Sequence, residues 1–216
     1  MARTSARSIA AAVLETAGQT FCEELKIPLE RGTPSPLFRT LCFSLLSSTR
    51  IGHRAALSAA RALADAGWTT PPKMNDSTWR QRTDVLNRSG YARYDESTST
   101  MLGDTTAHLL DEYGGDLRRL RDAAERNPQA ERGLLKEFKG IGNVGVDIFF
   151  REIQFVWDEL LPFADRRTLS AARQLKLGND SDALRKLVDS DRDYVRLAAG
   201  LVRVDLEDRY GEIRVA

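Results

Sequence analysis

The sequence predicts an all-α protein. Apolar residues recur at intervals of three and four along most of the chain, which is the spacing that places them on one face of an α-helix. Glycine and proline punctuate these amphipathic stretches at short intervals. We find no alternation of apolar and polar residues long enough to build a sheet, and no segment that repeats at a fixed period.

Composition limits the classes of protein to consider. The 216 residues are 42% hydrophobic, which is enough for a core in one domain or in two small helical lobes. The formal net charge is +1, so binding to nucleic acid would have to rest on local basic clusters. Cys22 and Cys42 are flanked by apolar residues, as expected of buried free thiols in a reducing compartment. Because we find neither a membrane-spanning run nor a signal-peptide cleavage pattern, we expect a cytoplasmic protein with no membrane partner.

Three helices are expected in the first third of the chain. The first runs from Ser8 to Leu25, where apolar residues recur every four positions. The second starts at Ser35-Pro36, since proline is tolerated in the first turn of a helix, and it should be deeply buried. The third is alanine-rich, runs from about His53 to Ala66 and closes at Gly67, and Pro71-Pro72 should lie in the loop that follows.

The middle of the chain continues the helical pattern. Asn75 or Asp76 is the expected cap of a helix that stops at Gly90. A longer helix is expected from about Asp95 to Tyr113, before a glycine pair, and a short helix around residues 117–123.

A tight hairpin between two helices is the most informative local pattern. Residues 131–138 and about 143–157 have helical spacing, and Lys139-Gly140-Ile141-Gly142 joins them. Glycines let the backbone turn sharply and approach another molecule, while the first amides of the second helix have no acceptor within that helix. Those amides, with Lys139 beside them, could grip a DNA phosphate without reading bases. An ordinary turn between packed helices is the alternative, because Gly-x-Gly alone is a weak motif.

An acidic residue, Asp165, follows the second, apolar helix of this motif and a proline. Asp165 precedes Arg166 and Arg167 and is the expected N-cap of another helix, with two more helices after it. Capping alone would account for an aspartate at this position, and capping and chemistry are compatible roles.

The order and spacing of these features resemble the helix-hairpin-helix DNA glycosylase superfamily, particularly its endonuclease III-like branch. In that family a Leu-Pro-Gly-Val-Gly hairpin is followed by an apolar helix and a Val-Asp-Thr-His segment whose aspartate is catalytic. The matching segments here are residues 138–142 and 164–167. Upstream, residues 36–49 look like the family's first barrel helix, and residues 89–97 look like its glycine-aromatic loop. The resemblance covers about residues 28 to 175.

The resemblance implies an architecture and a set of site residues. It implies a six-helix barrel lobe at residues 31–159, with the helix-hairpin-helix at 131–157, a second lobe made from residues 1–30 and 160–216, and a DNA-binding cleft. Asp165 would be catalytic, because a carboxylate under the sugar stabilises the positive charge that develops when an N-glycosidic bond breaks. The base must first flip out of the stack, and Ser48, Thr49 and Arg50 lie where the family carries its wedge. The implied DNA-binding residues are Lys139, Gly140, Ile141, Gly142, Asn143, Val144, Gly145, Arg166 and Arg167.

The chain departs from the family at positions that change the expected chemistry. Val144 occupies the place of the lysine that forms a Schiff base in strand-cleaving members, so we expect no lyase activity. No cysteine follows Cys42, so we expect no iron-sulfur cluster. His53 and His108 lie far apart in sequence without nearby ligands, so we expect no metal site and no cofactor. Arg166-Arg167 replaces Thr-His and Thr49 replaces a glutamine, so the family's substrate is not carried over.

The sequence therefore predicts a monomeric, monofunctional DNA glycosylase of base-excision repair. It would hydrolyse the N-glycosidic bond of a damaged or mispaired base in double-stranded DNA, in the cytoplasm at the nucleoid. Two alternatives stay open: a helix-hairpin-helix protein that binds distorted DNA without catalysis, and a helical protein-interaction domain that makes no contact with DNA.

Overall fold

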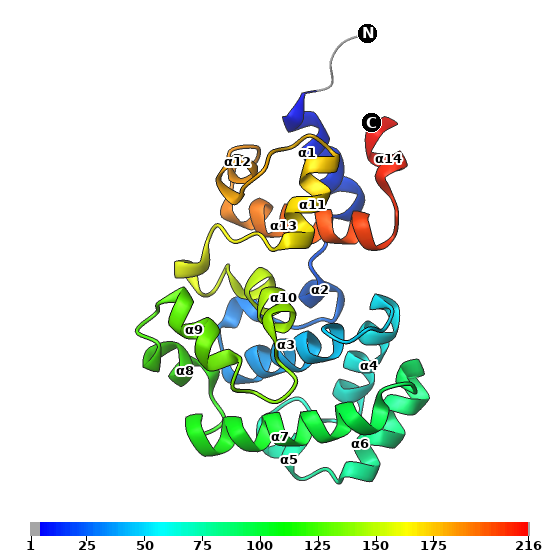
Figure 1. The fold of residues 1–216 in the computed structure, drawn as a ribbon, viewed down its shortest axis with the longest axis vertical. Helices are drawn as coiled ribbons and strands as arrows, with labels where there is room; N and C mark the ends of the chain where they lie inside the picture. The colour runs from blue at the N-terminus through cyan, green and yellow to red at the C-terminus, as the bar shows by residue number, and fades with distance from the viewer. Residues whose placement is uncertain (1–4, 216) are drawn as a thin grey trace. The chain divides into compact units, whose positions relative to one another are not determined.

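A computed structural model describes residues 5–215, and within that range it contains helices and no strand (Figure 1). The predicted all-α class is confirmed. None of the helices in this range combines the length and apolarity that crossing a bilayer requires. The α-helices are α1 (Ala6–Ala17), α2 (Phe21–Glu24), α3 (Pro34–Ser47), α4 (His53–Asp65), α5 (Pro71–Asn75), α6 (Trp79–Leu86), α7 (Asp95–Tyr113), α8 (Leu117–Ala123), α9 (Pro128–Leu135), α10 (Asn143–Ile153), α11 (Arg166–Gln174), α12 (Ser181–Arg185), α13 (Asp191–Leu206) and α14 (Tyr210–Val215).

The chain folds into two compact units. The central unit is the continuous segment Leu25–Phe149. The terminal unit contains the residues up to Glu24 and those from Phe150 onward. Segments from before and after the central unit therefore fold together. Helix α10 is continuous through the boundary between Phe149 and Phe150.

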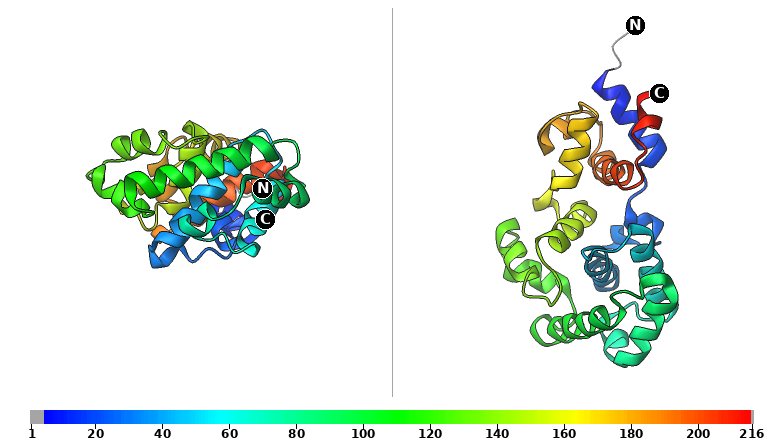
Figure 2. Two further views of the ribbon diagram at one scale, coloured as in Figure 1. Left: turned by 90° about the horizontal axis from the view of Figure 1, so that it is seen from below. Right: turned by 45° about the vertical axis from the view of Figure 1, so that its right-hand side comes forward.

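In the terminal unit, α13 is the helix on which the others pack. Helices α1 and α11 pack against it, and α14 packs on α1 (Figures 1 and 2). Gly200 permits the close approach of α1, since an added Cβ there would lie 3.1 Å from Val13 Cγ1 and 3.2 Å from the Ala17 carbonyl oxygen. Tyr194 and Leu201 of α13 are fully buried in the core of this unit. The hydrophobic effect of this burial holds α1 against the helices that follow the central unit.

The expectation of one continuous helix from Ser8 to Leu25 is wrong. Helix α1 ends at Ala17, where the Gly18 N–H donates to the Leu14 carbonyl at 3.0 Å, and α2 begins at Phe21. A reciprocal capping box starts the second helix: the Glu23 N–H donates to Thr20 Oγ1 and the Thr20 N–H donates to Glu23 Oε2, both at 3.0 Å. Two otherwise orphaned amides are thereby satisfied, which favours a new helix start over a continuous helix.

In the central unit, α3 is deeply buried, as the sequence predicted, and packs against α4. Helices α4 and α7 confirm the predicted segments, and α7 has the predicted bounds. Two expectations nearby are wrong. Pro71-Pro72 opens the short helix α5, because proline is compatible with a first turn. Helix α6 is capped by Thr78, in a capping box with Gln81, and not by Asn75 or Asp76.

Both helices of the hairpin end earlier than predicted, and α9 also begins earlier, at Pro128 and not at Glu131. Helix α9 ends at Leu135 and not Phe138, because residues 136–138 continue with i to i−3 hydrogen bonds that tighten the last turn. Helix α10 begins at the predicted Asn143 but ends at Ile153 and not Trp157. After α11 the described part of the chain forms three further helices, one more than predicted.

Candidate functional site

The hairpin of the central unit presents its turn to solvent. Gly140 has a φ of +85°, and an added Cβ would lie 2.5 Å from Met101 Sδ, so only glycine fits without a shift. Ile141 is buried and its N–H donates to the Phe138 carbonyl at 3.0 Å. Gly142 and Asn143 are exposed. A buried apolar anchor therefore holds a turn whose remaining residues face outward.

The first turn of α10 follows directly from this hairpin. The Gly142 carbonyl accepts from the Val146 N–H at 3.0 Å, which makes Gly142 the residue at which the helical bonding begins. By helix geometry, the N–H groups of the first turn have no carbonyl acceptor within their own helix. Val144 is 58% exposed and Gly145 is buried. The exposed Lys139 adds a positive charge to the same turn.

The segment expected to act as a wedge lies against the hairpin. Ser48 and Gly140 are 92 positions apart in the chain, yet Ser48 Oγ lies 3.5 Å from the Gly140 carbonyl oxygen. On the other side, Thr105 Oγ1 donates to the Lys139 carbonyl at 2.9 Å. Side chains from α7 and from the end of α3 thus fix the turn, and the fold brings two of the predicted site segments together within the central unit.

The three residues of that segment differ in how they are held. Thr49 Oγ1 lies 2.6 Å from the Tyr91 hydroxyl, which in turn donates to the Leu46 carbonyl at 2.8 Å. Burial raises the pKa of Tyr91, so the phenol remains a neutral hydrogen-bonding group. Ser48 also donates to the Leu45 carbonyl at 2.9 Å. Arg50 is exposed, and it is the residue of the three whose side chain is presented most fully to solvent.

Asp165 belongs to the terminal unit and is the N-cap of α11, as the sequence predicted. Its Oδ1 accepts from the Thr168 N–H at 2.7 Å. The residue is 7% exposed. Its second oxygen, Oδ2, accepts a hydrogen bond from Arg151 Nη1. Both carboxylate oxygens therefore have partners inside the protein.

Arg151, which the sequence analysis did not single out, lies at the centre of a buried ionic cluster. Its side chain is 4% exposed, and its Nε lies 3.6 Å from Glu152 Oε1. Its guanidinium carbon lies 5.5 Å from the centroid of the Phe21 ring, within cation–π range. A signal was present in the sequence, because Arg151 and Glu152 interrupt an otherwise apolar run from 148 to 153. Charges inside such a run are seldom buried without partners.

Glu152 links this cluster to the N-terminal segment. Its Oε2 accepts from the Cys22 N–H at 2.9 Å, an amide in the first turn of α2. Burial raises the pKa of Glu152, and the neighbouring Arg151 opposes part of that effect. The carboxyl group is enclosed by protein, so it serves as a structural acceptor and not as a surface charge.

The loop before Asp165 is held by one side chain that directly follows α10 and by another from α13. The Gln154 amide donates to the Phe163 carbonyl at 3.2 Å and accepts from the Phe163 N–H at 2.8 Å. The Tyr194 hydroxyl donates to the same carbonyl at 3.0 Å, and burial raises the pKa of that phenol. Gln154 and Tyr194 thus fix the backbone two residues before Asp165. The sequence offered no clear sign of these contacts, since each joins residues from separate elements.

The two arginines after Asp165 are both exposed but differ in their partners. Arg167 Nη1 forms an ion pair with Asp205 Oδ2 at 2.8 Å. A phosphate at Arg167 would have to compete with that carboxylate, whereas Arg166 is presented to solvent on the first turn of α11.

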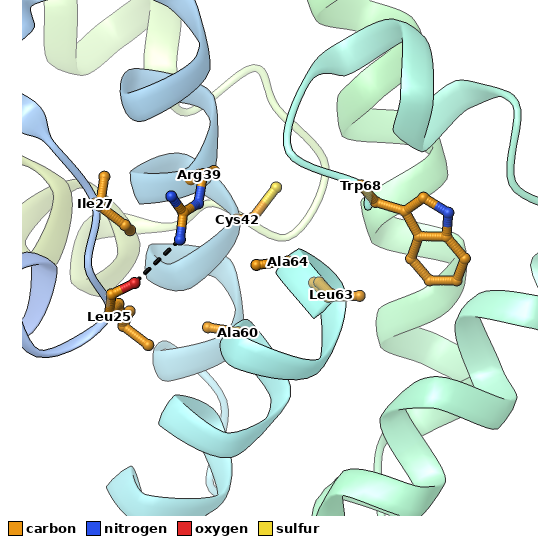
Figure 3. Close-up of a pocket in the computed structure, with 8 residues that line it drawn as sticks. All are labelled: Leu25, Ile27, Arg39, Cys42, Ala60, Leu63, Ala64 and Trp68. Carbon is orange, nitrogen blue, oxygen red and sulfur yellow. Dashed lines mark hydrogen bonds between the residues drawn. The ribbon is translucent and has the colours of Figure 1, made fainter. Parts of the chain in front are cut away.

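The central unit also contains a small pocket between α3, α4 and the segment after α2 (Figure 3). Its volume of about 10 Å³ is close to what one water molecule needs. Arg39 spans one side by donating to the Leu25 carbonyl at 3.0 Å, and burial raises the pKa of the Cys42 thiol to about 12. The pocket is too small for a nucleobase.

A larger polar hollow, of about 650 Å³, lies in the terminal unit beside the end of α1. The arginines that line it are paired with carboxylates: Arg196 with Glu23 at 3.0 Å, Arg203 with Glu24 at 2.8 Å, and Arg209 with Glu207 at 3.5 Å. These pairs leave the hollow without a concentration of unmatched positive charge. Among residues 5–215, no three His, Cys, Asp or Glu side chains are grouped as metal ligands would be.

No protein-family model matches this chain, and a search of curated proteins found no match.

Proposed function

We propose that the protein is a monofunctional DNA glycosylase of the helix-hairpin-helix type. In this proposal the hairpin at residues 139–145 binds the backbone of duplex DNA, and Asp165 supports hydrolysis of the N-glycosidic bond of a damaged or mispaired base. One observation carries the DNA-binding part: the exposed glycine turn at the start of α10 has the Ser48 segment bonded directly to it. That juxtaposition supports the proposal, because the amides that would bind a phosphate then lie beside the segment that would enter the duplex.

The proposed grip on DNA uses charge and backbone amides. A phosphate would accept hydrogen bonds from the first amides of α10, at the positive end of the helix dipole, with Lys139 beside it. Such contacts carry no sequence information, which suits an enzyme that must scan DNA for rare lesions. Arg50 is exposed two residues after Ser48, and it has the longest side chain of the three residues of the proposed wedge.

The proposed chemistry is hydrolysis without a covalent enzyme intermediate. The bond between the sugar C1′ and the base nitrogen breaks, and its electron pair leaves with the base, which takes up a proton. The oxygen of a water molecule forms the new bond to C1′ and releases a proton. The Asp165 carboxylate stabilises the positive charge that develops on the sugar. Val144 cannot act as a nucleophile, so the product is an abasic site in an intact strand.

The contacts of Asp165 favour a second candidate, a non-catalytic protein that binds distorted DNA. The carboxylate is buried and already shares its charge with Arg151. A carboxylate paired in this way has less negative potential to offer a cationic transition state than an unpaired one. In this second candidate the Arg151–Asp165 pair would be purely structural.

Base release from a panel of labelled duplexes separates these functions. The panel contains alkylated, deaminated, oxidised and mismatched bases, with and without alkali, and compares wild type with Asp165→Asn. Asn is also a good N-cap, so this variant keeps the start of α11. Asp180→Asn is the matched control, because Asp180 is likewise an aspartate N-cap in the terminal unit, on α12, but is exposed.

If the protein is a glycosylase, we expect alkali-dependent cleavage by wild type and Asp180→Asn and none by Asp165→Asn. The affinity for DNA should be equal in all three proteins. Base release that survives in Asp165→Asn contradicts the proposed role of that residue. Tight, salt-sensitive binding without release from any duplex supports the second candidate. A protein that does not bind DNA at low salt would contradict both candidates. A helical protein-interaction domain would then be the remaining function.

A further inference from the structure

We infer that Arg151 is a positioning residue for Asp165: its buried guanidinium fixes the orientation of the carboxylate that the proposed reaction uses. This inference rests on the proposed function of Asp165. Arg151 would act through its hydrogen bond to the carboxylate, and this role needs no contact with DNA or with the reacting water.

The two bonds to Asp165 together define the plane of its carboxylate. The cap bond from the Thr168 N–H holds Oδ1, and Arg151 holds Oδ2. The terminal torsion of an aspartate has a broad, roughly two-fold profile, so a single cap bond leaves the second oxygen able to swing. An ionised carboxylate has about four acceptor sites. Two bonds therefore fix its direction and leave acceptor capacity for a water molecule and for the sugar.

Arg151 is itself held, as a positioning group must be. Its guanidinium faces the Phe21 ring and Glu152. Its carbonyl accepts from Gln154 Nε2 at 3.1 Å, and the same amide group bonds both the N–H and the carbonyl of Phe163. One segment at the end of α10 thus holds both the guanidinium and the loop that carries Asp165.

Stability alone does not account for such a pair. Removing two charges from water costs free energy, and replacing a buried ion pair by well-packed apolar residues is often neutral or stabilising. A buried, hydrogen-bonded pair does, however, restrict the conformations of both side chains. Arg151 at this position is therefore better explained by the geometry it imposes on Asp165 than by the stability it adds.

The test compares Arg151→Met, Arg151→Lys and wild type in single-turnover base release, with DNA affinity measured on the same duplex. Arg203→Met is the matched control, because Arg203 is a second buried arginine over the Phe21 ring, at 4.6 Å. We expect Arg151→Met to slow the chemical step by about 10²-fold, the size typical of a misplaced reacting group, with unchanged affinity for DNA. Arg151→Lys should restore part of the rate. Arg203→Met should keep the wild-type rate.

The two readouts separate positioning from general support of the fold. A slower chemical step with unchanged affinity for DNA assigns the effect of Arg151→Met to the reaction, because a variant with a damaged fold would lose both. Wild-type rates in both Arg151 variants, or an equal loss in Arg203→Met, would overturn the inference while leaving the glycosylase proposal intact. A wild-type protein that releases no base removes the proposed function, and the inference with it. If Arg151→Met does not fold, Arg151→Lys against Arg203→Lys decides the question by the same rate comparison.

Discussion

Arg151 and Asp165 form a hydrogen-bonded ion pair in the interior of the terminal unit, with side chains that are 4% and 6% exposed. They come from different elements, the last turn of α10 and the cap of α11. Neither charge has enough contact with water to be solvated on its own, so each depends on the other. This mutual dependence makes the stability of the protein sensitive to either residue, and it can be measured without knowing a substrate.

Arg151→Met should lower the free energy of unfolding by about 3–5 kcal/mol, because it leaves the Asp165 carboxylate buried without its cation. The double variant Arg151→Met with Asp165→Asn should be more stable than the Arg151→Met single variant, since neither charge then remains. Urea unfolding, monitored by circular dichroism, measures the free energy of unfolding of wild type and of each variant. Strict additivity of the two substitutions would show that the pair does not couple in the folded protein.

The pH dependence of stability should report on Glu152. Burial raises its pKa in the folded protein above the usual value of 4.5, so folding favours the protonated carboxyl. The stability from this group is complete below pH 4.5 and is lost as the pH rises through the raised pKa. Glu152→Gln, which does not titrate and keeps an oxygen for the Cys22 amide, should become more stable relative to wild type as the pH rises. Thermal midpoints from pH 4 to 9 test this, and parallel profiles would contradict it.

Gly140 and Gly142 should respond differently to the same substitution. Gly140→Ala should cost about 1–3 kcal/mol, because alanine must adopt a positive φ and its Cβ would press on Met101. At Gly142 an added Cβ meets nothing within 4 Å, so Gly142→Ala is the control and should change the unfolding free energy far less. Equal losses in the two variants would mean that the hairpin does not keep this turn in solution.

Lys139→Gln should weaken binding to duplex DNA to the same extent for all sequences. It should also reduce the slope of log affinity against log salt concentration by about 1, because one phosphate contact no longer releases a counterion. Lys73→Gln, which removes an exposed lysine of α5 in the same unit, is the control and should leave the slope unchanged. If both variants change the slope equally, the effect belongs to overall charge and not to the hairpin.

Local patterns in the sequence were sufficient for the helical class and for several boundaries. Helix periodicity depends on residues three and four positions apart, so α4 and α7 could be predicted directly. The cap at Asp165 follows from the same local rules. The break between α1 and α2 also had a local signal, the Thr20 and Glu23 capping box, which the continuing apolar spacing obscured.

Only the tertiary structure decided which side chains meet. Periodicity assigns a residue to a buried or an exposed face, but it does not name the partner across the core. The contact of Ser48 with Gly140 joins positions 92 apart, and the pairing of Arg151 with Asp165 depends on how the loop after α10 returns to the end of that helix. A buried charge must find an opposite charge or a hydrogen-bond partner, and that partner is selected by packing over the whole unit and not by neighbouring sequence.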